Sequence, residues 1–268
     1  MTTESINISI DSGIATLKLC RPHVMNALAA STIRELRSAL ASLRDNAEVR
    51  TVVLTGEGKA FCTGADLSDP EISLDGPLSQ RSEKLAQLMR GEINPTVSDL
   101  LHFPKPTIAA VNGPAVGAGI GLALSCDIVI ATQSAYFMNV FTPRMGLVPD
   151  MGVTWHLERL VGRARARGMT MLGDRLSAHD AAEWGMIWKA VPDAELAAEV
   201  SATARRLADA PPLALRALSE ILDEAGSNGF DEQLDREGEV QCSLVSTADA
   251  QEAVTAFREK RLPHFTGR

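Results

Sequence analysis

The sequence has few of the residues that form metal centres or disulfide frameworks. Its four cysteines, Cys20, Cys62, Cys126 and Cys242, are widely scattered and form neither a CxxC pair nor a cluster with histidine. The five histidines also lack the spacing of a metal site or a catalytic triad. Because metal ligands usually lie closer together in a sequence, we expect reduced structural thiols and no metal.

Net positive charge and long apolar runs are also absent. The formal net charge of −8 at pH 7 leaves no basic footprint for nucleic acid, although a few local cations can still hold an anionic ligand. No apolar run approaches the roughly 18 residues that span a bilayer. The start, Met1-Thr2-Thr3-Glu4-Ser5, lacks the basic and apolar regions of a signal peptide. We expect a soluble, cytoplasmic protein with no nucleic-acid or membrane partner.

The pattern of apolar residues predicts strands that alternate with helices. A β-hairpin is expected over Ile6–Ile10 and Ile14–Leu19, and short buried strands over 51–54, 107–111 and 127–131. Helical spacing runs from 31 to 43, with Ser31 as the expected N-cap. Short loops join these elements, which favours an α/β architecture.

Two regions differ from this alternation. Residues 68–100 are more polar, contain three prolines and lack a sustained apolar stripe, so we expect a mobile segment over a site. Beyond Asp150 the pattern is wholly helical, with helices over 151–160 and 164–172 and further helices towards the end. Such a helical part needs an apolar surface to cover, and a subunit interface is a natural candidate.

Two loops of small residues are the most informative feature. They are Phe61-Cys62-Thr63-Gly64-Ala65-Asp66-Leu67 and Val111-Asn112-Gly113-Pro114-Ala115-Val116-Gly117-Ala118-Gly119-Ile120-Gly121. Gly and Ala leave backbone N–H groups open to a ligand, and the second loop places the N–H of Ala118 at a helix N-terminus. Two such donors that converge would stabilise an oxyanion. The alternative is a tight turn whose glycines only let strand and helix pack.

The loops FCTGADL and AVNGPAVGAGI, with Leu19-Cys20-Arg21-Pro22 and Asn26-Ala27-Leu28 upstream, resemble the crotonase (enoyl-CoA hydratase/isomerase) superfamily. The resemblance runs from about Ile6 to Gly267. It implies an α/β, ClpP-like spiral of β-β-α units over residues 1–200 that holds an acyl-CoA site. It also implies a helical part over 201–268 that packs on the core and on a neighbouring subunit. The expected partners are an acyl-CoA thioester substrate and other copies of the chain, as a homotrimer or a hexamer (a dimer of trimers), with no cofactor beyond the substrate's CoA.

The same resemblance assigns roles to individual residues. The N–H groups of Ala65 and Ala118 would hold the thioester oxygen as it becomes an enolate. Substrate and CoA contacts map onto a further set: Thr63, Gly64, Asp66, Leu67, Gly117, Lys59, Phe257 and Lys260. Phe257 and Lys260 match positions that reach the CoA of a neighbouring subunit, and a surface lysine exposed to solvent is an equal alternative for Lys59.

The departures from the family select the chemistry. Its hydratases activate water with two glutamates, at positions where this sequence has Gly121 and Thr142, and neither residue can act as a carboxylate acid or base. The remaining candidate is Asp150, which resembles the carboxylate of the family's double-bond-shifting isomerases. Apolar neighbours such as Met138 and Phe141 would raise its pKa towards neutrality, as suits a general base. Its alternative role is the N-cap of the following helix.

We therefore predict an acyl-CoA isomerase that converts 3-enoyl-CoA to 2-enoyl-CoA or isomerises ring-1,2-epoxyphenylacetyl-CoA. Three segments are similar to the branch of the family that performs the second reaction in phenylacetate breakdown: 162–166, 183–188 and 265–268. A hydratase with non-standard catalytic residues and a non-catalytic acyl-CoA-binding protein remain alternatives. A dehalogenase is disfavoured because it pairs its aspartate with a tryptophan where this chain has Thr142.

Overall fold

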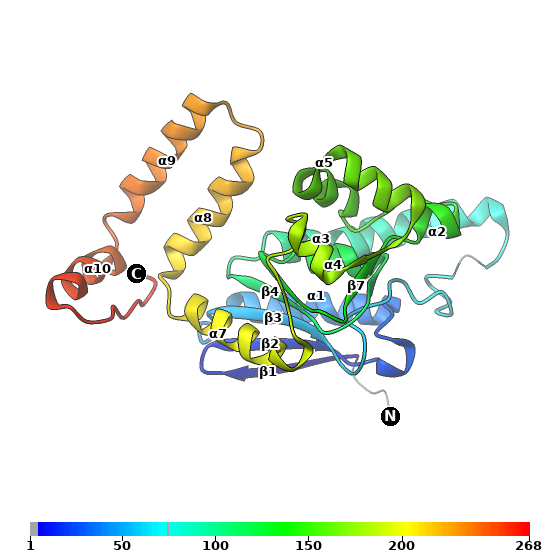
Figure 1. Cartoon of the computed structure of the whole chain (residues 1–268), viewed down its shortest axis with the longest axis horizontal. Helices are drawn as coiled ribbons and strands as arrows, with labels where there is room; N and C mark the ends of the chain where they lie inside the picture. Colours follow the sequence, from blue (N-terminus) through cyan, green and yellow to red (C-terminus); the bar gives the residue numbers. More distant parts are fainter. Residues whose placement is uncertain (1–4, 74) are drawn as a thin grey trace.

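The structure is a computed structural model of the chain, and it describes residues 5–73 and 75–268 (Figure 1). The expectation about a signal peptide rests on the start of the chain, and residues 1–4 there lie outside the described residues. Two sheets and most of the helices form one body, and helices α8, α9 and α10 extend to one side of it (Figure 1).

The first sheet has six strands in the order β1-β2-β3-β4-β6-β9. β1 and β2 form an antiparallel hairpin through a two-residue turn, and every later pair in this sheet is parallel. The strands are β1 (Ile6–Asp11), β2 (Ile14–Leu19), β3 (Thr51–Gly56), β4 (Thr107–Val111), β6 (Ile128–Thr132) and β9 (Lys189–Val191). The predicted hairpin and the three predicted buried strands are therefore confirmed.

The second sheet has three strands, β5 (Ala115–Val116), β7 (Tyr136–Met138) and β8 (Arg175–Ser177), in the order β5-β7-β8. The chain passes from β4 in the first sheet to β5 in the second, then into helix α4, and repeats this path through β6, β7 and α5. This is the expected spiral of β-β-α units. Strands β8 and β9 show that the prediction of a wholly helical chain beyond Asp150 is wrong, because three-residue strands are too short to show a period of two.

Ten α-helices complete the described chain. They are α1 (Ala30–Asp45), α2 (Leu78–Leu88), α3 (Asn94–Leu101), α4 (Ala118–Leu124), α5 (Val153–Leu172), α6 (Ala178–Glu183), α7 (Leu196–Ala208), α8 (Pro212–Ala225), α9 (Phe230–Leu244) and α10 (Ala248–Glu259). Helix α5 is interrupted at Gly162, where φ is 73°, so it matches the two shorter helices that the sequence predicts. Within the described residues, no helix is both long and apolar enough to cross a membrane.

Residues 68–100, expected as a mobile segment over a site, contain helices, and their mobility stays a prediction. They form α2, a π-helical turn (η2, Met89–Ile93) and most of α3, and both Val97 and Leu100 are buried. Pro95 does not prevent this, since it lies in the first turn of α3, where a proline needs no N–H partner. Leu74, within this range, lies outside the described residues.

Helix α1 begins differently from the sequence expectation. Its first residue is Ala30, whose N–H donates to the carboxylate of Asp69 at 3.0 Å, and Ser31 is not the cap. The capping group therefore comes from 39 residues along the chain, which local sequence cannot reveal.

The helices differ sharply in how much they bury. All seven residues of α4 are buried, and α7 packs Val200, Ala204 and Ala208 against the body. In contrast, neither α8 nor α9 contains a buried residue, and several of their leucines are exposed to solvent. The division into a core over 1–200 and a helical part over 201–268 stays a prediction.

Candidate active site

The two small-residue loops meet at the edge of the second sheet. Cys62 N–H donates to Pro114 O at 3.2 Å, and Val116 N–H donates to Cys62 O at 2.9 Å. This close pairing depends on glycine, because a Cβ at Gly119 would collide with the Cys62 carbonyl. Packing is thus one purpose of these glycines, as the alternative interpretation holds.

The N–H of Ala118 is the first donor of helix α4 and points out of its N-terminus. The preceding Gly117 adopts φ 54° and ψ −119°, outside the regions that residues with a Cβ favour, and its carbonyl accepts from Ile120 N–H at 3.0 Å. In a trans peptide the N–H of Ala118 points opposite that carbonyl. It therefore faces the space before the helix, where the helix dipole favours an anion.

Gly64, the residue before Ala65, lies beside the N–H of Ala118. A Cβ placed on Gly64 would lie 3.6 Å from Ala118 N and 3.1 Å from Val116 O. Within residues 5–73 and 75–268, neither the Ala65 N–H nor the Ala118 N–H has a hydrogen-bond acceptor. Two adjacent free donors are what an oxyanion hole requires.

Asp150 lies in a sharp turn directly before helix α5. Met151 and Gly152 follow it with φ of 50° and 77°, and Gly152, not Asp150, is the N-cap. No side chain caps this helix, so the N-cap interpretation of Asp150 is wrong. The Oδ1 atom of Asp150 is buried without a hydrogen-bond partner in the described chain, and burial raises the pKa of the carboxyl to about 6.

The turn after Asp150 packs directly on helix α4. A Cβ on Gly121 would lie 2.6 Å from the Cβ of Met151 and would collide with the Met151 carbonyl oxygen. Because Gly121 is three residues beyond Ala118, this contact places the turn about 4.5 Å along α4 from the free N–H. The same contact leaves no room for a side chain at position 121, and Thr142 is exposed on the π-helical turn η3 (Phe141–Met145).

A second connection between α4 and α5 was not foreseen from the sequence. His156 is buried, and its Nε2 lies 3.3 Å from Ser125 Oγ. The Ser125 hydroxyl in turn donates to Gly121 O at 2.8 Å. Burial lowers the pKa of His156 to about 4, so the ring is neutral at pH 7. Ser125 and His156 are 31 residues apart, and no local motif marks them as partners.

The structure gathers some of the other predicted residues and separates the rest. Thr63, Gly64 and Gly117 lie in the paired loops, Leu67 is half exposed and Lys59 is exposed. The Asp66 carboxylate pairs with Arg21 inside the fold. Phe257 and Lys260 are exposed at the end of α10, far from α4 and its loops (Figure 1).

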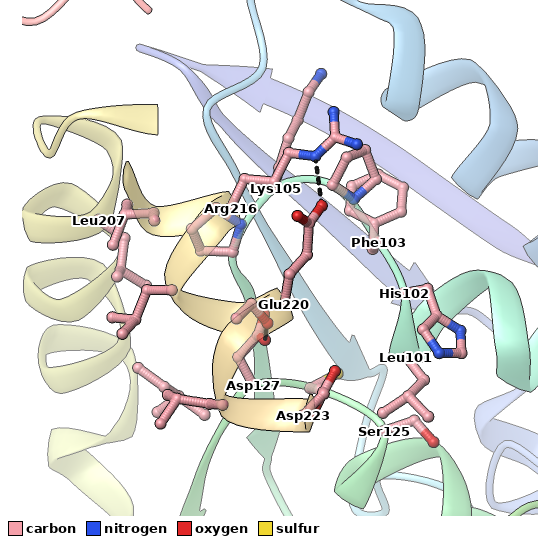
Figure 2. Close-up of a pocket in the computed structure, with 18 of the residues that line it drawn as sticks. Leu101, His102, Phe103, Lys105, Ser125, Asp127, Leu207, Arg216, Glu220 and Asp223 are labelled. Atoms are coloured by element: carbon pink, nitrogen blue, oxygen red, sulfur yellow. Dashed lines mark hydrogen bonds and ion pairs between the residues drawn. The ribbon is translucent and has the colours of Figure 1, made fainter. Parts of the chain in front are cut away.

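A cavity of about 660 Å³ opens between α8 and the body, away from the paired loops (Figure 2). Several of its polar groups have partners within the chain: Asp127 accepts from Thr107 and from Ser219, and Arg216 pairs with Glu220 at 2.9 Å. Leucines of α8 line it together with Phe103. It is a gap beneath a helix that buries none of its residues, and it holds none of the predicted site residues.

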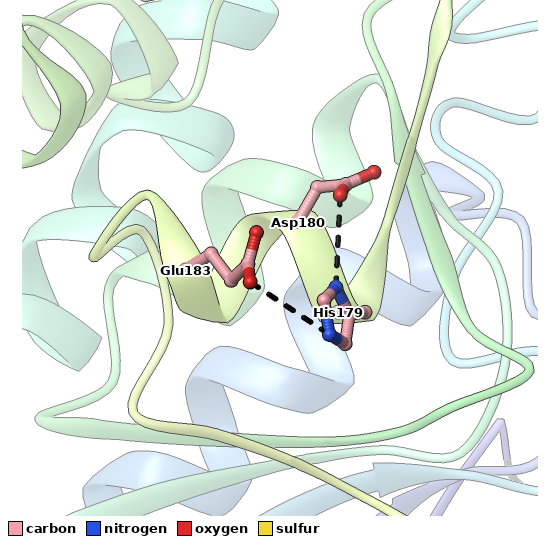
Figure 3. A group of neighbouring side chains, drawn as sticks. All are labelled: His179, Asp180 and Glu183. Carbon is pink, nitrogen blue, oxygen red and sulfur yellow. Dashed lines mark ion pairs between the residues drawn. The ribbon is translucent and has the colours of Figure 1, made fainter.

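One group of possible metal ligands occurs among the described residues, on helix α6 (Figure 3). His179 lies 3.7 Å from Asp180 and 3.9 Å from Glu183, and all three side chains are exposed. Asp180 also accepts from Ser177 Oγ at the start of the helix. Ion pairing and helix capping account for this arrangement.

Comparison with known proteins gives one consistent result. The family model for enoyl-CoA hydratase/isomerase matches residues 9–268. The chain is 44% identical over 268 residues to a protein of Rhodobacter capsulatus named "Probable enoyl-CoA hydratase", covering 100% of both. It is 42% identical over 265 residues to the 1,2-epoxyphenylacetyl-CoA isomerase of Escherichia coli K12, covering 99% of each. The crystal structure of an enoyl-CoA hydratase from Bacillus anthracis matches with a TM-score of 0.90 at 31% identity, over 98% of this chain and 100% of that chain.

The contact between Gly121 and Met151 predicts the effect of one added methyl group. Gly121→Ala should lower the free energy of unfolding by about 1–3 kcal/mol, since overpacking forces the turn after Asp150 to move. Gly168→Ala is the matched control, because Gly168 lies inside helix α5 with open space around its Cα and should gain about 0.5–1 kcal/mol. Urea titrations of the three proteins test this, and a Gly121→Ala protein as stable as wild type contradicts the close contact.

The raised pKa of Asp150 predicts a pH-dependent cost in stability. The folded state binds this proton more tightly than the unfolded state, so the group stabilises the fold below pH 3.8 and that contribution is lost as the pH rises through about 6. Asparagine cannot ionise. The free energy of unfolding of Asp150→Asn should therefore rise by about 2 kcal/mol, relative to that of wild type, as the pH is raised from about 4.5 to about 8. Urea unfolding of both proteins at these two pH values measures this, with Glu158→Gln at an exposed position as control. If Asp150→Asn differs from wild type by the same free energy of unfolding at both pH values, the fold does not disfavour the charged form of Asp150.

Proposed function

Because the chain belongs to the enoyl-CoA hydratase/isomerase family, we propose that it is an acyl-CoA isomerase that converts 3-enoyl-CoA to 2-enoyl-CoA. The crotonase-family resemblance and its α/β spiral, both expected from the sequence, are confirmed. One observation carries the proposal within the family. Asp150 is a half-buried carboxylate with a buried Oδ1 beside helix α4, and the two positions of the hydratase glutamates hold Gly121 and Thr142.

The proposed reaction moves one proton and no net electrons. The Asp150 carboxylate takes a proton from the carbon α to the thioester, and the C–H electron pair moves towards the thioester oxygen. The resulting dienolate oxygen accepts hydrogen bonds from the N–H groups of Ala65 and Ala118. The protonated Asp150 then returns the proton at the γ carbon, which gives the conjugated product and restores the carboxylate.

The environment of each group suits this chemistry. A base with a pKa of about 6 is mostly ionised at pH 7 and is still a usable acid once protonated. The two N–H donors act where negative charge develops, and loss of one such donor typically costs about 2.7–4 kcal/mol of transition-state stabilisation. No redox step occurs, so we propose that the reaction needs no cofactor beyond the CoA of its substrate.

Ring-1,2-epoxyphenylacetyl-CoA is the second substrate class that we propose. An enolate and an acid beside it can also assist the opening of an epoxide next to a thioester, so the same residues serve both reactions. The 42% identity to the 1,2-epoxyphenylacetyl-CoA isomerase supports this choice, which would place the chain in phenylacetate breakdown. The similar identity to a protein named as a hydratase makes water addition the reaction to test against it.

The helical end of the chain supports assembly into a homotrimer or a hexamer. Helices α8 and α9 bury no residue in the single chain, and Leu222 and Leu234 are 63% and 49% exposed. Phe257 is 85% exposed at a position that would reach the CoA of a neighbouring subunit. We propose that a second copy of the chain covers these surfaces.

The cytoplasmic location expected from the sequence stays a prediction.

Parallel assays of three substrates test the proposed function. Purified protein is offered 3-hexenoyl-CoA, crotonyl-CoA and ring-1,2-epoxyphenylacetyl-CoA, and each product is identified by mass and chromatography. We expect isomerisation of the first or the third, and no 3-hydroxy product from crotonyl-CoA. Asp150→Asn should lower kcat by about 10²–10⁴ because general acid–base catalysis is lost, with acyl-CoA binding nearly unchanged.

The pH profile provides an internal control. Because the carboxylate is the active form, kcat/KM should rise about tenfold per pH unit below pH 6 and level off above it. Full activity of Asp150→Asn would exclude this residue as the base. Turnover of crotonyl-CoA alone would favour a hydratase, and tight binding with no turnover of any substrate would favour a non-catalytic acyl-CoA-binding protein.

A further inference from the structure

The direction of the Ala65 N–H depends on how its neighbours pair with Leu28. Gly64 O accepts from Leu28 N–H at 2.8 Å, and Asp66 N–H donates to Leu28 O at 2.9 Å. The described chain contains no cis peptide bond, so the Ala65 N–H points opposite the Gly64 carbonyl and therefore away from Leu28. Any shift in the pairing with Leu28 would therefore change the direction in which the Ala65 N–H points.

The guanidinium of Arg21 bridges the two paired segments. Its Nη1 donates to Ala27 O at 2.6 Å, and its Nη2 pairs with Asp66 Oδ2 at 2.8 Å. Ala27 directly precedes Leu28, and Asp66 directly follows Ala65. One planar group thus joins both segments next to the residues whose pairing aims the donor.

Both ends of this bridge are fixed by further hydrogen bonds. Asp66 Oδ1 accepts from the Ser68 N–H at 3.0 Å and from the Ser68 hydroxyl at 2.6 Å. The backbone N–H of Arg21 donates to Asn26 Oδ1 at 3.0 Å, and the side-chain amide of Asn26 donates to Ala60 O at 2.8 Å. The Ser68 hydroxyl and Arg21 hold the pKa of the Asp66 carboxyl below its usual range, so the ion pair persists at neutral pH. Both carboxylate oxygens are engaged within the chain and not turned towards a substrate.

We propose that Arg21 and Asp66 are positioning residues that aim the Ala65 N–H at the thioester oxygen. The inference rests on the proposed function, which supplies that oxygen. Arg21 and Asp66 side chains are only 20% and 9% exposed, so the bridge is largely shielded from competing water. A lysine cannot replace the arginine here, because an ammonium lacks the rigid planar fork that reaches two fixed acceptors at once.

The test compares two conservative variants with a matched control. Arg21→Lys keeps the charge, Asp66→Asn keeps the shape, and Arg34→Lys makes the same change in an exposed arginine that holds Glu71 through two nitrogens at 2.8 and 3.0 Å. The first readout is the infrared band of a ¹³C-labelled thioester carbonyl in bound butyryl-CoA. The second is the split between kcat for 3-hexenoyl-CoA and the Kd for butyryl-CoA.

We expect the bound carbonyl band of wild type and of Arg34→Lys to be shifted from its position in water. In Arg21→Lys and Asp66→Asn the band should return towards that position and kcat should fall roughly tenfold to a hundredfold, while Kd changes less than about threefold. Asp66→Asn, which keeps the side-chain volume, decides the matter if Arg21→Lys does not fold.

The outcomes separate this inference from the proposed function. If wild type shifts the carbonyl band but isomerises no enoyl-CoA, the isomerase function fails and the band still measures the positioning role. An unchanged band and unchanged kcat in both folded variants overturn the positioning role, even where wild type isomerises its substrate. An unshifted band in wild type overturns it as well, because no donor would then be aimed at the oxygen.

Discussion

The site depends on backbone hydrogen bonds that engage the peptide groups next to Ala65 and Ala118. These bonds leave the N–H groups of Ala65 and Ala118 themselves free in the described chain. Leu28 holds the backbone on both sides of Ala65, and the Gly117 carbonyl is engaged by Ile120 at the start of α4. Trans peptide geometry then turns the Ala65 N–H away from Leu28 and the Ala118 N–H out of the N-terminus of α4. In the proposed mechanism these donors are preorganised by the fold, which is the condition for electrostatic stabilisation of an oxyanion without reorganisation at the moment of reaction.

The placement of Asp150 follows from the same helix. Gly121 lets the turn at Met151 pack against α4, and the hydrogen-bonded pair of Ser125 and His156 also joins the end of α4 to α5. The cost of this arrangement is a half-buried carboxylate whose buried Oδ1 has no partner among the described residues, and a non-glycine residue at positive φ directly after it. Such features destabilise a fold and cluster at functional sites, where the surrounding packing holds them in place.

How far the sequence predicts this structure depends on the range of the interactions. The hairpin, strands β3, β4 and β6 and the two loops are predictable because a run of apolar β-branched residues or a string of small residues is a local signal. Asp150 is predicted as the base because its position resembles a family motif, and this role stays a prediction. The cap of α1 by Asp69, the contact of Ser125 with His156 and the bridge from Arg21 to Asp66 join residues 31 to 45 positions apart, so no short pattern shows them. The three-residue strands β8 and β9 contradict the prediction of a wholly helical chain beyond Asp150, because they are too short to produce a clear period.

Exchange of substrate protons with solvent tests the central claim most directly, since enolate formation is the step that the two N–H groups and Asp150 share. Phenylacetyl-CoA incubated with the protein in D₂O is followed by mass spectrometry for deuterium at the carbon α to the thioester. Wild type should incorporate deuterium well above the rate in buffer, and Asp150→Asn should be slower by about 10²-fold or more. Exchange at the buffer rate in wild type, or exchange undiminished in Asp150→Asn, would contradict the account.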